Sequence, residues 1–248
     1  MRVVGFLLAG WLAAAAPAWA QGHGMGAPTE AAPFGMPVAD QHVWYHLIAD
    51  RLEGRFGRDS AFHWNTEAWA GTDNHRVWLK SEGLLAPGAL EEGRHEVLYS
   101  RPITSFFDAQ LGLRMDADDG PGRGWAALGI EGLAPLFFHV SATAYAADQG
   151  RLAARLEGSY DLLLTQQLVL QPQLELNFYS RPDPARSIGA GLSELEAGLR
   201  LRYEISRKFA PYIGLAYENK FGGTARLARL AGEGPSQMQF TAGVRIWY

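Results

Sequence analysis

The stretch LVLQPQLELNF, residues 168–178, alternates between two kinds of side chain. Its even-numbered positions hold leucine, proline or phenylalanine, whereas glutamine, glutamate and asparagine fill most odd-numbered positions. Residues 194–205 repeat the alternation and place charges of both signs on the polar face. Side chains that alternate at every second residue indicate β-strands rather than helices. An apolar face that is unbroken over about ten residues has the length needed to cross a bilayer at a tilt.

The same alternation continues from about residue 42 to the end of the chain and predicts twelve strands. Their expected spans are 42–54, 61–71, 75–83, 94–101, 104–116, 124–132, 137–147, 151–163, 168–179, 193–205, 210–221 and 236–248. Short turns are expected at 72–74, 102–103, 134–135, 165–167 and 206–208, and they alternate with connections that include all the long loops, at 84–93, 117–123, 180–192 and 222–235. Short periplasmic turns and longer outer loops are typical of outer-membrane barrels. Because lipid offers no hydrogen-bond partner, a spanning sheet must close on itself. We therefore expect an all-β fold, a closed antiparallel transmembrane β-barrel of about twelve strands with both termini in the periplasm.

The segment before the first strand has two parts. Residues 1–20 have the features of a signal peptide, with Arg2 before an apolar stretch and Ala18-Trp19-Ala20 before the expected cleavage. The apolar stretch is shorter than the ~20 residues of a membrane-spanning helix. Residues 21–40 are rich in Gly, Pro and Ala without a period, which predicts a short disordered periplasmic arm. The expected barrel occupies residues 41–248, in the outer membrane of a Gram-negative cell.

Composition excludes several classes of function. The chain has no cysteine, which excludes a disulfide framework, thiolate metal sites and a cysteine nucleophile. The formal net charge is −4 and no run of Lys or Arg is present, so a nucleic-acid partner is not expected.

Several stretches are shared with a known family. They are ADRLE (49–53), WNTEAWAG (64–71), WLKSEG (78–83), LYSRPI (98–103), FDAQLGLR (107–114), GIEGLAP (129–135), YDLLLTQ (160–166) with residues 168–176, GAGL (189–192) and RKFAPYIG (207–214). Over nearly the whole barrel the chain resembles the copper resistance protein B family of Gram-negative outer membranes. The resemblance implies a copper-linked protein that acts beside a periplasmic multicopper oxidase in copper tolerance. Family members often carry a long Met- and His-rich N-terminal segment, whereas this arm is short, which argues against a high-capacity copper store.

Candidate copper ligands lie in the arm and on the polar faces of strands. Without cysteine, copper ligands are limited to Met thioethers, His imidazoles and, for Cu(II), carboxylates. The candidates are His23, Met25 and Met36 in the arm, His42 and His46 on one face near the start of the barrel, His63 and Glu67 on one polar face, and His139 on another. If these faces converge in the lumen, they form a site or route for copper. The alternative for the arm is a solvated linker that binds no metal. The alternative for the barrel histidines is ordinary contact with neighbouring lumen charges. No spacing between the candidates is diagnostic of a metal site. The copper assignment therefore depends on the family resemblance.

Other functions remain open. The lumen carboxylates and basic residues form either a structural plug of ion pairs or a cation passage. An enzyme would need a nucleophile and a base at the outer rim, for which the chain offers Ser81, Ser100 and Ser105 with His75 and His95, none of them in a G-x-S-x-G setting. Finding such a pair there would favour an enzyme, and a closed barrel without metal ligands would favour a structural role.

The sequence thus predicts a monomeric outer-membrane protein, not an enzyme, that takes part in copper resistance by binding a copper ion or passing it through a polar lumen. Its expected partners are outer-membrane lipid, copper and a periplasmic multicopper oxidase. Loss of His63 or His139 is expected to weaken copper binding by the barrel. The alternative is a structural or generally cation-permeable barrel without a specific metal site.

Overall fold

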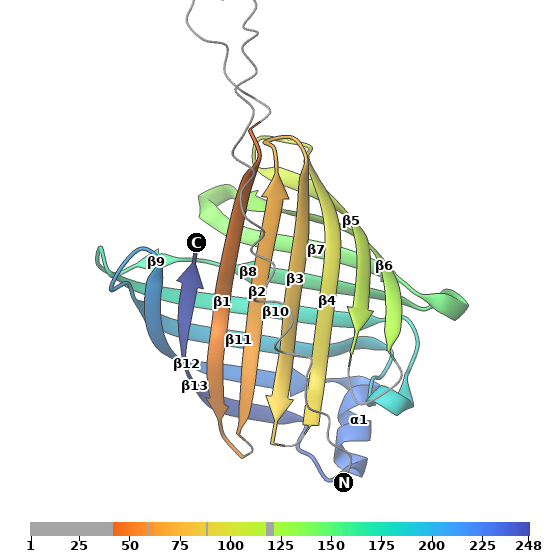
Figure 1. Cartoon of the computed structure of the whole chain (residues 1–248). Coiled ribbons are helices and arrows are strands. Elements are labelled where there is room, and N and C mark those ends of the chain that lie inside the picture. Colours follow the sequence, from red (N-terminus) through yellow and green to blue (C-terminus); the bar gives the residue numbers. More distant parts are fainter. Residues whose placement is uncertain (1–41, 59, 88, 118–121) are drawn as a thin grey trace, which may run out of the picture. The chain divides into compact units, whose positions relative to one another are not determined.

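The computed structural model describes residues 42–58, 60–87, 89–117 and 122–248 (Figure 1). The predicted signal peptide, 1–20, and the predicted arm, 21–40, lie outside the described residues. The strands are β1 (Trp44–Phe56), β2 (Ala61–Gly71), β3 (Arg76–Ala86), β4 (Ala89–Pro102), β5 (Phe107–Asp116), β6 (Arg123–Ala134), β7 (Phe138–Ala146), β8 (Leu152–Ser159), β9 (Leu162–Leu163), β10 (Leu168–Tyr179), β11 (Gly191–Tyr203), β12 (Phe209–Lys220) and β13 (Ser236–Trp247). The helical elements are the 3-10 turns η2 (Pro135–Phe137), η3 (Asp148–Gly150) and η4 (Pro184–Arg186), and the helix α1 (Gly222–Leu230).

The strands form one closed antiparallel barrel. Sequence neighbours pair around the sheet, and β13 pairs with β1 to close it, with Ile48 opposite Trp247 and Phe56 opposite Phe240. The short segments β8 and β9 both pair with β10 and are two parts of one transmembrane strand. The interruption lies opposite Pro172, which accepts a hydrogen bond from the Tyr160 N–H at 3.1 Å but has no N–H to return. The prediction of a twelve-stranded closed barrel is therefore confirmed.

The two faces of the barrel separate the residue types as predicted. On β13, Gln239 and Thr241 are 8 % and 0 % exposed, while their neighbours Met238 and Phe240 are 63 % and 46 % exposed. The outward positions of the other strands likewise carry most of the exposed large apolar side chains. An apolar outer belt around a polar interior is the arrangement that lipid requires of a barrel.

The two ends of the barrel differ in their connections. The turns β2–β3, β4–β5, β6–β7, β9–β10 and β11–β12 lie at the end where β1 begins and β13 finishes, and α1 lies at the other end (Figure 1). Since short turns face the periplasm in such barrels, the end where β1 begins and β13 finishes is the periplasmic one. Within the described ranges, no helix combines the length and apolarity needed to cross a bilayer.

One of the predicted outer loops is wrong, and another contains a helix that was not predicted. The segment 84–93 is mostly strand, because β3 continues to Ala86 and β4 begins at Ala89, with Leu84 opposite Glu92. The doublet Leu84-Leu85 breaks the alternation in the sequence, and a register shift at that doublet absorbs it. The segment 222–235 contains α1, whose residue Thr224 is buried.

Side-chain contacts hold α1 against the barrel. The Thr224 Oγ1 atom lies 2.6 Å from the Ser193 hydroxyl on β11, and it accepts a hydrogen bond from the Gly189 N–H at 2.8 Å. Ala225 and Ala228, one turn along the same helical face, are also buried. The helix is thus fixed to the start of β11 at the outer end of the barrel.

Candidate functional site

Glu53 on β1 is the centre of a buried ion-pair group in the lumen. Its side chain is 0 % exposed, and it accepts hydrogen bonds from Arg200 Nε and Nη2 at 2.9 and 2.8 Å. Arg55 Nε donates to it at 3.0 Å, and so does the Tyr212 hydroxyl at 3.0 Å. Arg55 also binds Glu196 with two bonds of 3.0 and 2.8 Å. These charge-assisted contacts tie β1 to β11 and β12 across the interior.

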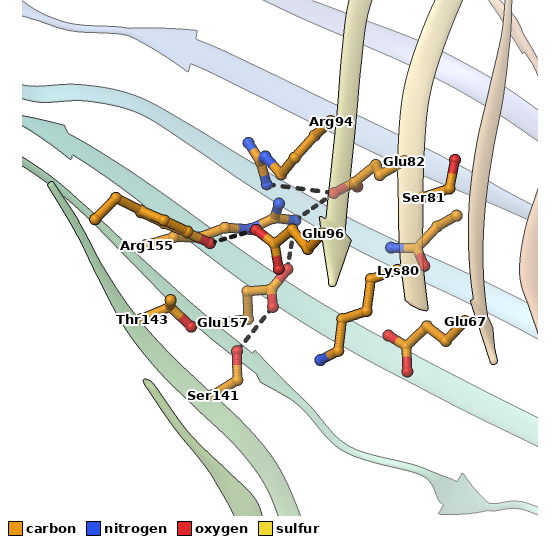
Figure 2. Close-up of a pocket in the computed structure, with 12 residues that line it drawn as sticks. Glu67, Lys80, Ser81, Glu82, Arg94, Glu96, Ser141, Thr143, Arg155 and Glu157 are labelled. Carbon is orange, nitrogen blue, oxygen red and sulfur yellow. Dashed lines mark hydrogen bonds and ion pairs between the residues drawn. The ribbon is translucent and has the colours of Figure 1, made fainter. Parts of the chain in front are cut away.

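A second group surrounds Arg155 on β8. Its Nη2 atom lies 2.7 Å from Glu82 and 2.8 Å from Glu175, and it also pairs with Glu157. Figure 2 shows the guanidinium between Glu82 and Glu157, with Arg94 also paired with Glu82. Oxygen atoms of the three carboxylates lie within 4.8 Å of one another, close enough to hold a metal ion. In this structure the guanidinium supplies the positive charge that a metal would bring.

Removing that guanidinium is expected to create a cation site. In Arg155→Ala, the carboxylates of Glu82, Glu157 and Glu175 would repel one another, and oxygen ligands of this kind suit Ca²⁺. We expect added Ca²⁺ at ten times its dissociation constant to stabilise folded R155A by roughly 1.4 kcal/mol and to leave the unsubstituted protein unchanged. Thermal unfolding with and without Ca²⁺ measures this, and Arg123→Ala at the outer rim is the matched control. Equal responses of R155A and R123A to Ca²⁺ would show that Arg155 does not occupy a latent cation site.

His63 on β2 joins the two groups. It is 4 % exposed, its Nδ1 atom lies 3.4 Å from Glu53, and its Nε2 atom lies 3.4 Å from Glu82. Glu67, predicted to share a site with His63, instead lies opposite Lys80, whose Nζ contacts Glu131 at 2.5 Å. His63 is therefore a lumen histidine enclosed by carboxylates that already have guanidinium partners.

A cavity of about 450 Å³ opens at the periplasmic end of the lumen. His139 lines it together with Asp108 and Glu131. Asp108 accepts hydrogen bonds from Arg76 at 3.1 Å and from the Ser100 hydroxyl at 3.0 Å. Among the residues that the structure describes, the His139 imidazole has no hydrogen-bond or ion-pair partner, and it is exposed. It is a free nitrogen donor beside two carboxylates.

Aromatic rings surround His46 at the same end. The His46 ring lies 6.2 Å from the Trp69 ring and 5.7 Å from the Trp247 ring. Trp69 in turn lies 6.0 Å from Trp78, which also lines the periplasmic cavity. His42 packs against Trp44 at 4.3 Å, at the start of β1. The indole rings of Trp69 and Trp78 thus connect His46 to the cavity that His139 lines.

The predicted ligands are therefore not gathered in one cluster. His139 and His46 share the periplasmic end, whereas His63 belongs to the ion-pair groups. His23, Met25 and Met36 lie outside the described residues. Asp108 and Glu131 were not among the predicted ligands, although they lie directly opposite each other on β5 and β6. Both residues lie on the polar faces of strands that are neighbours in the sequence, and this pattern would have identified them as candidates.

The residues considered for acyl chemistry fall in different places. Ser100 is buried in the lumen, where it donates to Asp108, and Ser105 lines the periplasmic cavity. Ser81 and His95 do meet on the outer face, with Oγ and Nδ1 3.1 Å apart. No hydrogen bond or ion pair joins His95 to a carboxylate within the described part of the chain, so the third member of a catalytic triad is missing there.

Comparison with known proteins agrees with this architecture. The family model of the copper resistance protein B precursor matches residues 43–248. Copper resistance protein B of Escherichia coli is 41 % identical over 215 residues, which are 86 % of this chain and 73 % of that protein. The copper resistance protein B homolog of Pseudomonas syringae pv. tomato (strain ATCC BAA-871 / DC3000) is 43 % identical over the same shares of the two chains. Among solved structures, the NanC porin superposes with a TM-score of 0.53 at 13 % identity, covering 82 % of this chain and 99 % of that one. The porin likeness shows the fold of an outer-membrane barrel, and the chain belongs to the copper resistance protein B family.

Proposed function

We propose that this barrel binds copper at its periplasmic end and takes part in copper resistance without catalysing a reaction. The observation that supports this most strongly is the unpartnered His139 imidazole in a cavity that also holds Asp108 and Glu131. An imidazole nitrogen with carboxylate oxygens is a donor set that suits Cu(II). In this proposal copper is bound cargo rather than a catalytic cofactor.

The register of the strands allows these three side chains to converge. Asp108 lies directly opposite Glu131, and Glu131 lies opposite Ser141. His139 is two residues from Ser141 on the same face of β7, so it is a diagonal neighbour of Glu131. Diagonal neighbours in a sheet are about 7–8 Å apart, within reach of long side chains. A copper ion would recruit Glu131 from Lys80 and Asp108 from Arg76 by changes of rotamer alone.

The filled centre of the lumen favours binding over free passage. An ion that moved outward from the cavity would have to break the ion pairs of the Arg155 group and the Glu53 group, whose carboxylates already have guanidinium partners. We therefore place copper on the periplasmic side of these groups. The same filled centre is the observation that favours the alternative, a structural barrel without a metal site.

The periplasmic end is also the face that a soluble copper protein can reach. We propose that a monomeric barrel exchanges copper there with a periplasmic multicopper oxidase. In this arrangement His46, at the aromatic mouth, and His42 lie on the path between the cavity and that partner. His23, Met25 and Met36 of the arm would offer softer ligands suited to Cu(I).

Copper titration of the refolded mature protein tests the proposal, beside a version that lacks residues 21–40. We expect the truncated barrel to keep one saturable Cu(II) site with an affinity within about threefold of the full chain, because His139 and its carboxylates remain. Loss of Cu(II) binding with the arm would make His23, Met25 and Met36 the ligands. Absence of binding in both forms would support the structural alternative.

A further inference from the structure

The outer face of β2, β3 and β4 carries a group of polar side chains within the apolar belt. We call Trp64, Thr66, Ser81 and His95 the outer-face cluster. Ser81 lies between the lumen residues Lys80 and Glu82, so its side chain faces lipid, and the same alternation turns His95 outward. Polar groups at membrane depth are costly and usually functional. The cluster is separate from the periplasmic copper cavity proposed above.

Hydrogen bonds link Trp64, Ser81 and His95 in a chain. The Trp64 indole N–H donates to Ser81 Oγ at 3.1 Å, and Ser81 Oγ lies 3.1 Å from His95 Nδ1. An indole N–H can only donate, so the Ser81 hydroxyl keeps its own hydrogen, which it can donate to His95 Nδ1. An imidazole that accepts at Nδ1 carries its hydrogen on Nε2. The His95 side chain is exposed, and its Nε2 atom has no partner among the described residues.

The indole is held in place by a glycine. Trp64 lies opposite Gly83 on β3, and a Cβ atom at Gly83 would come within 2.4 Å of two carbons of the Trp64 ring. Any larger residue at Gly83 would push the indole away from Ser81. Thr66 Oγ1 donates to the Ser81 carbonyl at 3.2 Å and ties the same strands together. The cluster is thus a built arrangement rather than a chance gathering of polar side chains.

The depth of the cluster places it in the outer leaflet. His95 is seven residues from Pro102, where β4 ends at the periplasmic side. At about 3.3 Å per residue and a tilt of about 40°, it lies ~18 Å from that end of an apolar band that is ~25 Å tall. On β4 the outward residues are Val97 and Tyr99 on the periplasmic side of His95, and exposed Glu91 on the outer side. His95 therefore lies in the outer-leaflet half of the apolar band.

We propose that the outer-face cluster binds the phosphate-bearing headgroup of an outer-leaflet lipid, with the His95 Nε2–H donating to a phosphate oxygen. A donor that faces the membrane is satisfied by a lipid or by interfacial water, and phosphate is the strongest acceptor that a lipid offers. The exposed edge of Trp64 is placed to pack against the glycerol or sugar next to that phosphate. Both lipid A and glycerophospholipids carry such a group, so the chemistry alone does not choose between them.

Native mass spectrometry of the detergent-purified mature protein tests this with three probes: lipid A, phosphatidylglycerol and diacylglycerol, which has no phosphate. We expect retained lipid A or phosphatidylglycerol, and about tenfold weaker retention in His95→Leu, the loss of one charge-assisted hydrogen bond. Ser81→Ala should weaken retention less, because the imidazole remains but loses its orientation. His75→Leu, which removes an exposed histidine at the periplasmic end, is the matched control and should retain lipid like the unsubstituted protein.

The outcomes separate the sources of the headgroup. Retention of lipid A alone identifies the outer-leaflet glycolipid, and retention of both phosphate lipids identifies the phosphate group itself. Equal retention by H95L and H75L, or equal retention of diacylglycerol, would overturn the proposal. So would covalent labelling of Ser81 by a fluorophosphonate, because it would make Ser81 a nucleophile rather than part of a binding site. Resistance to SDS at room temperature confirms that each variant is folded, and S81A carries the test if H95L is not.

Discussion

Replacing Glu53 by glutamine is expected to lower the free energy of unfolding of the barrel by about 3–5 kcal/mol, the usual effect of breaking a buried ion pair. The Glu53 side chain is 0 % exposed, and its partners Arg55 and Arg200 are 4 % and 3 % exposed. Glutamine keeps the shape of the side chain but turns one acceptor into an amide donor that faces guanidinium donors. Two buried cations would then share only Glu196 and the amide oxygen.

Glu233→Gln is the matched control for this substitution. Glu233 is 63 % exposed and lies 3.6 Å from Lys220, so its ion pair is screened by water. We expect that variant to change the free energy of unfolding by less than about 1 kcal/mol. Urea unfolding in lipid vesicles, followed by tryptophan fluorescence, measures both. Similar losses in the two variants would show that the Glu53 group does not stabilise the barrel.

Replacing His139 by alanine is expected to weaken Cu(II) binding at least about tenfold while leaving the free energy of unfolding nearly unchanged. The affinity falls because His139 is the one imidazole among the described residues that line the cavity. The stability is kept because the exposed imidazole has no partner to lose. Titration by intrinsic fluorescence quenching measures the affinity, and urea unfolding measures the stability.

His63→Ala is the matched histidine control for His139→Ala. His63 is buried between Glu53 and Glu82, so its loss is expected to destabilise the barrel by about 1–3 kcal/mol. Its effect on copper affinity should be small, although the sequence alone predicted weaker copper binding for both variants. The opposite result, copper affinity lost in H63A and kept in H139A, would move the site from the periplasmic cavity to the ion-pair groups.

Most of the fold could be predicted because alternation at every second residue is a local signal. Residues 168–178 alternate in the sequence, and β10 spans Leu168–Tyr179 in the structure. The outer extensions of β3 and β4, over residues 84–93, were missed because Leu84-Leu85 breaks that signal, and only the register shift with β4 restores it. The helix α1 was missed because its stability comes from contact with the barrel, through Thr224 and Ser193, rather than from its own short sequence.

The candidate site could be predicted only in part. The alternation of polar and apolar residues in each strand correctly predicts that His63 faces the charged lumen. The same alternation predicts a lumen-facing His139, which lines a cavity in the structure. The alternation does not show which charged side chains form ion pairs across the interior, because those pairs depend on how the closed sheet is staggered. Arg200 reaches Glu53 across 147 residues of sequence, and this pairing decides that the centre of the lumen is filled. The contact of Ser81 with His95 likewise needed the register of β3 against β4.

We propose that copper binds in the periplasmic cavity beside His139. Anomalous diffraction at the copper edge, from crystals of the mature protein loaded with Cu(II), tests it most directly. The predicted result is a single strong peak about 2 Å from an imidazole nitrogen of His139, the distance typical of a metal bound by histidine. A peak among Glu82, Glu157 and Glu175, or next to His63, would contradict the claim, and so would saturable copper binding in solution with no peak in the barrel.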